Sequence, residues 1–187
     1  MLSENIGVKY GMYLGLGFVL LFGVLYAVNP VYMYNTWLGL SIFPIIIVVM
    51  VLAARQTKKD LGGYATFTQL VSPAFAVMVF AQLFSSLFNY ILYNFIDPTL
   101  TDTLRNFTIE STYNMLNMFG TPEEEIEKAI TKVEEQDYSV TLSSTFMGFA
   151  MFAIFGFVVA SIIALIMRKN PPSNLNDQEV EKEELDV

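Results

Sequence analysis

Three long stretches of this chain contain no charged residue: Tyr10–Ala54, Leu61–Ile96 and Tyr138–Met167. They contain 45, 36 and 30 residues, together 111 of the 187. A helix crosses the apolar layer of a bilayer, about 30 Å thick, with about 20 apolar residues. The first stretch is therefore long enough for two crossings. The sequence predicts an all-α membrane protein in which four transmembrane helices form a bundle.

The four predicted spans cover about residues 10–28, 37–54, 73–96 and 146–167. Asn29 and Pro30 interrupt the helix between the first two spans, which predicts a tight helical hairpin. The third stretch is too long for one straight crossing, since 36 residues of helix extend about 54 Å. Because Pro73 lies in its first half, we expect residues 64–72 to form a separate interfacial or re-entrant piece.

The composition excludes much of the common chemistry of enzymes and transporters. The chain has no cysteine and no histidine, which removes thiolate sites, the commonest general base and the commonest nitrogen ligand for metals. No Asp, Glu, Lys or Arg lies near the middle of a predicted span, where coupled transporters place such groups. We therefore expect no catalytic, cofactor-binding or metal-binding residue. With a net charge of −8, nucleic acid is not an expected partner.

Basic residues near the span ends predict the orientation in the membrane. With four crossings they all fall on one side, which the positive-inside rule places in the cytoplasm together with both termini; they are Lys9, Arg55, Lys58, Lys59, Arg168 and Lys169. The other side receives segment 97–137, which has ten acidic and three basic residues. Residues 1–169 thus form the transmembrane domain, and the acidic segment 170–187 is expected to be a disordered cytoplasmic tail.

Segment 97–137 is predicted to form an amphipathic helical hairpin outside the membrane. Thr99 and Asp102 have the spacing of a capping box for its first helix. Gly120 suits the C-terminal cap of that helix, while Thr121 and Pro122 suit the N-cap and first position of the second helix. The hairpin then either lies on the membrane or caps the bundle.

Two sets of residues within the spans are candidates for helix contacts. Small residues four apart favour either intramolecular packing of spans one and four, which we prefer, or a dimerisation face; they are Gly7, Gly11 and Gly15 on the first span and Gly156, Ala160 and Ala164 on the fourth. A polar stripe on span three, whose members project within about 60° of one another, either bonds between helices or lines a wet cavity. It consists of Gln82, Ser86, Asn89 and Tyr93.

Two segments carry a resemblance to a known family. They read Gly62-Gly63-Tyr64-Ala65-Thr66-Phe67 before span three and Leu92-Tyr93-Asn94-Phe95-Ile96-Asp97-Pro98 at its end. In these motifs, and over about residues 5–168, the chain resembles the bacterial family catalogued as domain of unknown function 4199. The resemblance implies a four-span protein of the bacterial cytoplasmic (inner) membrane with no established activity, and it offers no catalytic residue to carry over.

The expected function is that of a non-enzymatic accessory or scaffold protein. Besides the lipid bilayer, its expected partner is another membrane protein, a second copy of itself or a lipid. Two other classes of function stay open. An oligomeric channel or carrier subunit would have a wet pathway along the polar stripe of span three. A subunit of an envelope lipid- or glycan-modifying enzyme would have carboxylates that converge at the outer interface.

Overall fold

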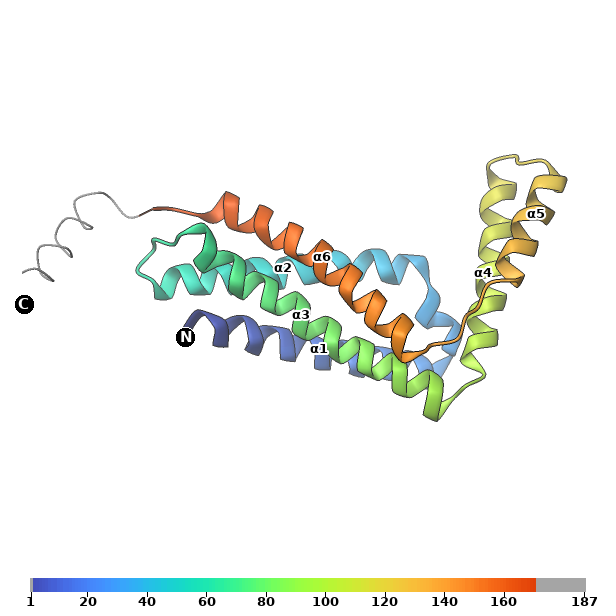
Figure 1. The fold of residues 1–187 in the computed structure, drawn as a ribbon, viewed down its shortest axis with the longest axis horizontal. Coiled ribbons are helices and arrows are strands. Elements are labelled where there is room, and N and C mark those ends of the chain that lie inside the picture. Colours follow the sequence, from blue (N-terminus) through green and yellow to red (C-terminus); the bar gives the residue numbers. More distant parts are fainter. Residues whose placement is uncertain (1, 171–187) are drawn as a thin grey trace, which may run out of the picture.

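The computed structural model describes residues 2–170, and in this range the chain forms six α-helices. They are α1 (Leu2–Val28), α2 (Thr36–Asp60), α3 (Phe67–Ile91), α4 (Leu100–Met118), α5 (Glu123–Glu134) and α6 (Leu142–Met167). The four long helices lie side by side, and the α4–α5 hairpin stands across their direction at one end (Figure 1). Except for Asn170, the predicted acidic tail lies outside the described residues.

Four helical segments are long and apolar enough to cross a membrane: Ile6–Val28, Thr36–Asp60, Phe67–Ile96 and Leu142–Met167. The prediction of an all-α protein with four candidate spans is thereby confirmed. The start of α1 and the end of α6 lie at the same end of the bundle, opposite the α4–α5 hairpin (Figure 1).

The turn between α1 and α2 is compact, as the sequence predicts. Residues Pro30–Tyr34 form a short 3₁₀ helix. Asn29 accepts a hydrogen bond from the amide of Val31 at 3.0 Å, and Asn35 accepts one from the amide of Trp37 at 2.9 Å. These side chains satisfy amides that have no partner within their own helical turn.

Helix α3 is the central helix of the bundle, because α1, α2 and α6 all pack on it. Gly7, Gly11 and Gly15 let α1 approach closely. A Cβ atom at Gly11 would lie 2.8 Å from the carbonyl oxygen of Val77, and one at Gly15 would lie 2.8 Å from Cβ of Phe84. The glycines of α1 therefore contact α3, whereas the sequence interpretation paired spans one and four.

The small residues of α6 also face α3. A Cβ atom at Gly156 would lie 2.5 Å from Cγ of Met78, and Ala160 and Ala164 are fully buried. Ala160 and Ala164 belong to the same buried cluster as Met78 and Val77 of α3. These small residues therefore form contacts between helices of the same chain, where they let two helix backbones approach closely in lipid.

The prediction of a helix break before Pro73 is wrong. Helix α3 begins at Phe67, preceded by a capping box in which the amide of Thr66 donates to Gln69 Oε1 at 2.8 Å, and it continues through Pro73. Pro73 removes one backbone hydrogen bond, and it is fully buried where α1 approaches at Gly7. The excess length lies at the ends of the segment, which finishes with a π-helical turn, η2 (Leu92–Ile96).

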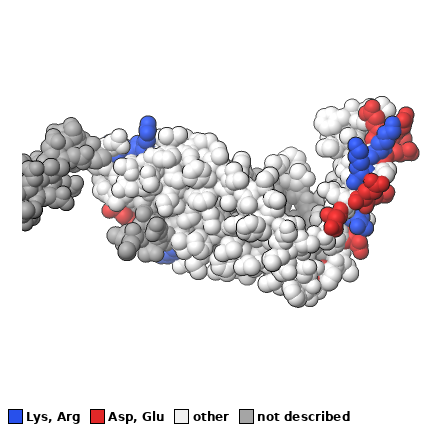
Figure 2. Space-filling model, in the orientation of Figure 1, with Lys and Arg blue, Asp and Glu red and all other residues white. Residues whose placement is uncertain are grey.

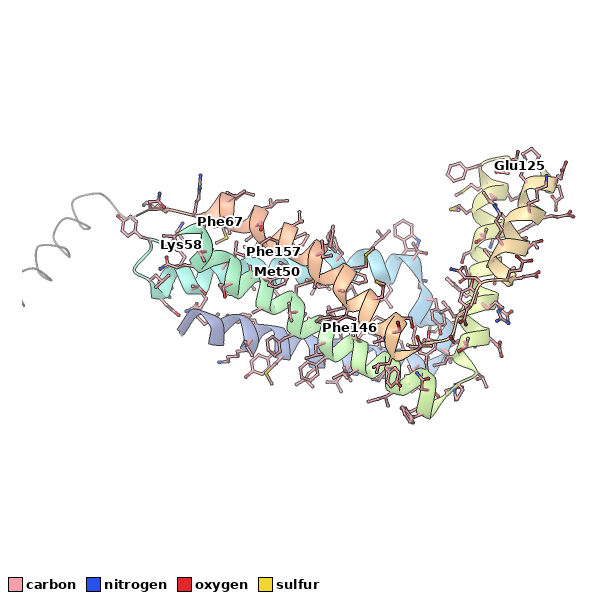
Figure 3. The ribbon with its side chains drawn as sticks, in the orientation of Figure 1. Met50, Lys58, Phe67, Glu125, Phe146 and Phe157 are labelled. Atoms are coloured by element: carbon pink, nitrogen blue, oxygen red, sulfur yellow. The ribbon has the colours of Figure 1, made fainter. Side chains whose placement is uncertain are left out.

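The loop between α2 and α3 is tied to the end of α6. Gly62 and Gly63 have φ values of +74° and +91°, which glycine adopts without steric cost. The backbones of Ala65 and Lys169 exchange hydrogen bonds of 2.9 and 3.0 Å. Lys58, labelled in Figure 3, donates from Nζ to the carbonyl oxygen of Met167 at 2.6 Å. A cation at the C-terminus of α6 thus satisfies an orphan carbonyl and complements the helix dipole.

The hairpin has the expected helices, although two caps differ from the prediction. Gly120 ends α4 with a φ of +70°. The prediction of a capping box between Thr99 and Asp102 is wrong, because Thr99 makes no side-chain cap bond. Instead, Asp97 Oδ1 accepts from the amide of Thr99 at 3.1 Å, in the manner of an Asx turn. The N-cap of α5 is Pro122, one residue later than expected.

Candidate functional site

A groove of about 260 Å³ lies between α3 and the first turns of α6. We call it the α3–α6 groove. Its α3 wall consists of Gln82, Ser86 and Asn89, and its other wall consists of Val140, Ser144, Thr145, Gly148, Phe149 and Phe152. No lining residue is charged, so the groove offers neutral hydrogen-bonding groups beside two aromatic rings.

Several polar groups of the groove are already engaged within their own helix. Gln82 Nε2 donates to Ser86 Oγ at 3.3 Å, Asn89 Nδ2 donates to the carbonyl oxygen of Ser85 at 3.0 Å, and Thr145 Oγ1 donates to that of Thr141 at 2.8 Å. Among the described residues, the amide oxygens of Gln82 and Asn89 accept no hydrogen bond. The groove therefore presents two acceptors, with further N–H donors beside them.

The groove reaches from the hairpin end of the bundle toward its middle. Asn89 and Gln82 lie 7 and 14 residues before Ile96, the end of the candidate span, which is about 10 and 21 Å along a helix. Half of the apolar layer of a bilayer is about 15 Å thick. The acceptor of Gln82 therefore lies far below the headgroup layer.

The α6 wall is open at the groove and closed beyond it. A Cβ atom at Gly148 would meet no atom within 4 Å, whereas two turns further along, one at Gly156 would collide with Met78. Ala160 and Ala164, which follow, are fully buried. Within this bundle the groove is therefore blind, and it ends where α3 and α6 come into close contact.

The structure brings three of the four predicted stripe residues together and places Tyr93 elsewhere. Tyr93 is buried, and its hydroxyl lies 2.6 Å from that of Tyr34. Tyr93 lies in the π-helical turn Leu92–Ile96, where the spacing of a regular α-helix, on which the predicted stripe depends, no longer holds. The α6 wall was missed by sequence reasoning, although the hydroxyl residues Ser144 and Thr145 at the start of a span were a usable signal.

Tyr93 belongs to a junction that joins the hairpin to the bundle. Tyr34 also donates to the carbonyl oxygen of Leu100 at 3.4 Å, and Tyr26 donates to Asp97 Oδ2 at 3.2 Å. Leu92, Tyr93 and Leu100 form a buried cluster beneath these bonds. Three helical segments thus hold the start of α4: α1, the 3₁₀ helix Pro30–Tyr34, and η2.

The carboxylates near this junction have the properties of structural acceptors. Hydrogen bonds hold the pKa of Asp97 below its ordinary value. The largest effect comes from the hydroxyl of Thr99, followed by the amide of Thr99 and the hydroxyl of Tyr26. Hydrogen bonds from the amide and hydroxyl of Ser139 likewise lower the pKa of Asp137. Both groups are therefore ionised acceptors at neutral pH. Within residues 2–170, no cluster of three or more carboxylates is arranged to hold a metal ion.

The residues of the family-like motifs lie at opposite ends of α3 and form no common site. Gly62 and Gly63 shape the loop at the end where α6 finishes, and Phe67 packs against the main core. At the other end, Asp97 holds the hairpin junction, with Ile96 before it and Pro98 after it.

No curated protein and no solved structure matches the sequence of this chain. One family model, described as "Protein of unknown function (DUF4199)", matches residues 9–169. This range includes the hairpin and nearly all of the four candidate spans. The chain therefore belongs to the DUF4199 family of proteins of unknown function.

Proposed function

We propose that this protein is a non-enzymatic accessory or scaffold subunit that binds a transmembrane helix of another membrane protein in the α3–α6 groove. The observation that carries the proposal is the amide pair of Gln82 and Asn89, whose oxygens lack partners among the described residues. In hydrocarbon, unsatisfied polar groups cost several kcal/mol. Such groups, together with an open glycine, are typical of surfaces on which membrane helices associate.

The depth of the groove favours a protein partner over a lipid. The polar groups of a lipid stay near the interface, while Gln82 lies about 21 Å from the end of its span. A transmembrane helix can carry a polar side chain to that depth. The volume of about 260 Å³ suits side chains inserted beside Gly148, with the partner backbone outside the groove.

The groove gives less support to a channel or carrier. A conducting pathway would continue to the other end of the bundle, but the close contact of Gly156 with Met78 closes the α3–α6 interface. An enzymatic role likewise finds little support at the hairpin end. Asp97 is used to hold the junction, and Asp102 is solvent-exposed and lies 3.7 Å from Arg105.

Photocrosslinking in native membranes tests the proposed groove partner. A benzophenone amino acid at Phe152, in the groove, is expected to give a discrete crosslinked protein product. The same group at Leu20, an exposed position on α1, is expected to give lipid adducts only. The product from Phe152 should be lost with Gln82→Leu and Asn89→Leu together, because leucine removes both acceptors and keeps the apolar bulk. A product that survives this pair of substitutions, or equal products from both positions, would contradict the proposal.

We further propose that both termini face the cytoplasm of a bacterium and that the hairpin lies outside. The support is the position of the basic residues: Lys59 lies in the last turn of α2 and Lys169 follows α6, at the end of the bundle where α1 begins. A cysteine at Glu127 should react with an impermeant maleimide in intact spheroplasts. A cysteine at Lys59 should react only after the membrane is opened. The reverse pattern would overturn this orientation, and the absence of native cysteines removes background labelling.

A further inference from the structure

The α4–α5 hairpin presents a second surface, which we call the inner face of α4. At 100° per residue, its members fall within an arc of about 140° that contains no charged side chain. They are Leu104, Phe107, Thr108, Ser111, Thr112, Met115, Met118 and Phe119. The rest of the helix surface carries the polar residues Asp102, Arg105, Asn106, Glu110, Asn114 and Asn117 together with Ile109, Tyr113 and Leu116. All charged side chains of α4 therefore lie outside the inner face.

The inner face of α4 is turned toward the bundle end. Together with Tyr34 and Thr36 of the bundle it encloses a hollow corner of about 350 Å³, lined on the α4 side by Leu104, Phe107, Thr108, Ser111, Thr112 and Met115. The rings of Tyr34 and Phe107 lie 5.7 Å apart. The contact is thus made at the base of α4, and the corner opens beyond it.

The outer half of this face has no protein partner among the described residues. Met115 is 49% exposed, and Met118 and Phe119 at the tip are each 77% exposed. Helix α5 packs on another side of α4 and carries most of the hairpin's acidic groups, with Glu125 near the tip (Figure 3). Figure 2 shows the hairpin as the strongly charged part of the molecule, while the long helices are nearly uncharged between their ends.

We infer that the inner face of α4 lies on the headgroup layer of the bilayer beside the bundle, with lipid filling the hollow corner. Because the hairpin stands across the four candidate spans (Figure 1), it runs along the surface of a membrane that those spans cross. Its charged groups then face water, while Met118 and Phe119 enter the interface as amphipathic surface helices do. Trp37, 78% exposed and next to Thr36 of the corner, is of the residue type enriched at that depth.

Spin labels at single introduced cysteines test this contact in the purified full-length protein, at one copy per phosphatidylcholine nanodisc. Labels at Met115 and Phe119 are expected to collide several-fold more with oxygen, relative to a water-soluble nickel complex, than a label at Asn117. Asn117 is a matched control because it is exposed, lies in the same helix and points away from the inner face. Equal nickel accessibility at all three positions would overturn the inference.

Further measurements separate apolar contact with lipid from electrostatic attraction and from contact with a protein. Because the face is uncharged, high salt should leave the label pattern unchanged, and loss of the pattern in high salt would overturn the inference. Phe119→Asp should raise the nickel accessibility of a label at Met115, because a carboxylate at the tip is costly to bury. Protection of Met115 and Phe119 only after addition of a native membrane extract would assign the face to a protein partner and overturn the lipid contact. None of these measurements depends on the partner proposed for the α3–α6 groove.

Discussion

Replacement of Gly11 by leucine is expected to separate α1 from α3 and to lower the free energy of unfolding by about 3 kcal/mol or more. A Cβ atom alone at this position would lie 2.8 Å from the carbonyl oxygen of Val77 and 3.0 Å from its Cα. The obstacle is backbone in the middle of a helix, which cannot move aside as a flexible side chain can. The bundle must therefore open along the α1–α3 interface.

Gly17→Leu is the matched control for this prediction. Gly17 lies on the same helix, but a Cβ atom there would meet nothing within 4 Å, and leucine is a better helix former than glycine. We expect its unfolding free energy to equal the wild-type value or to exceed it by up to about 1 kcal/mol. Unfolding of both variants in mixed micelles, titrated with dodecyl sulfate and followed by far-ultraviolet circular dichroism, compares them directly. Equal stability of the two variants would show that the α1–α3 contact is looser than described.

Replacement of Ile126 by alanine is expected to open the hairpin while the four long helices stay folded. Ile126 is 1% exposed and is the one buried residue of α5. Loss of a buried isoleucine side chain costs about 2–5 kcal/mol. Helix α5 has 12 residues, a length at which an isolated helix is marginal in water. Its order therefore depends on the contact with α4.

Amide hydrogen exchange checks this prediction element by element. In Ile126→Ala the amides of α5 should exchange much faster, while those of α3 should keep their protection. The control is Glu127→Ala, because Glu127 is exposed and its loss should leave α5 protected. If α1 and α3 lose protection together with α5, the hairpin and the bundle form one cooperative unit, and the prediction fails.

Local sequence signals located most of the helix ends. Asn29 and Pro30 interrupt the first apolar stretch, and Gly120 adopts the positive φ that ends α4. These signals work because they act within a few residues of the chain. The cap of α4 was less predictable, because Asp97, Thr99 and Asp102 offer competing local hydrogen bonds. Only the folded turn shows which of these bonds forms.

The candidate site was predictable in part. Gln82, Ser86 and Asn89 share a face of a regular helix, so their proximity follows from helix geometry. The facing wall could not be derived in this way, because nothing local to Gly148 or Phe152 says that α6 lies against α3. The position of Tyr93 could not be derived from α-helical spacing either, since this residue lies in the π turn and its hydroxyl contacts that of Tyr34.

The sequence by itself determined that this chain has four candidate membrane spans and a charged helical hairpin between the last two. The cause is that hydrocarbon excludes charge and requires about 20 apolar residues for each crossing. Only the tertiary structure decided which helix is central, which glycines face it, and where a polar groove stays open. Those outcomes depend on contacts between residues far apart in the chain, such as Gly11 with Val77 and Gly156 with Met78. The periodicity of one helix does not specify its partner.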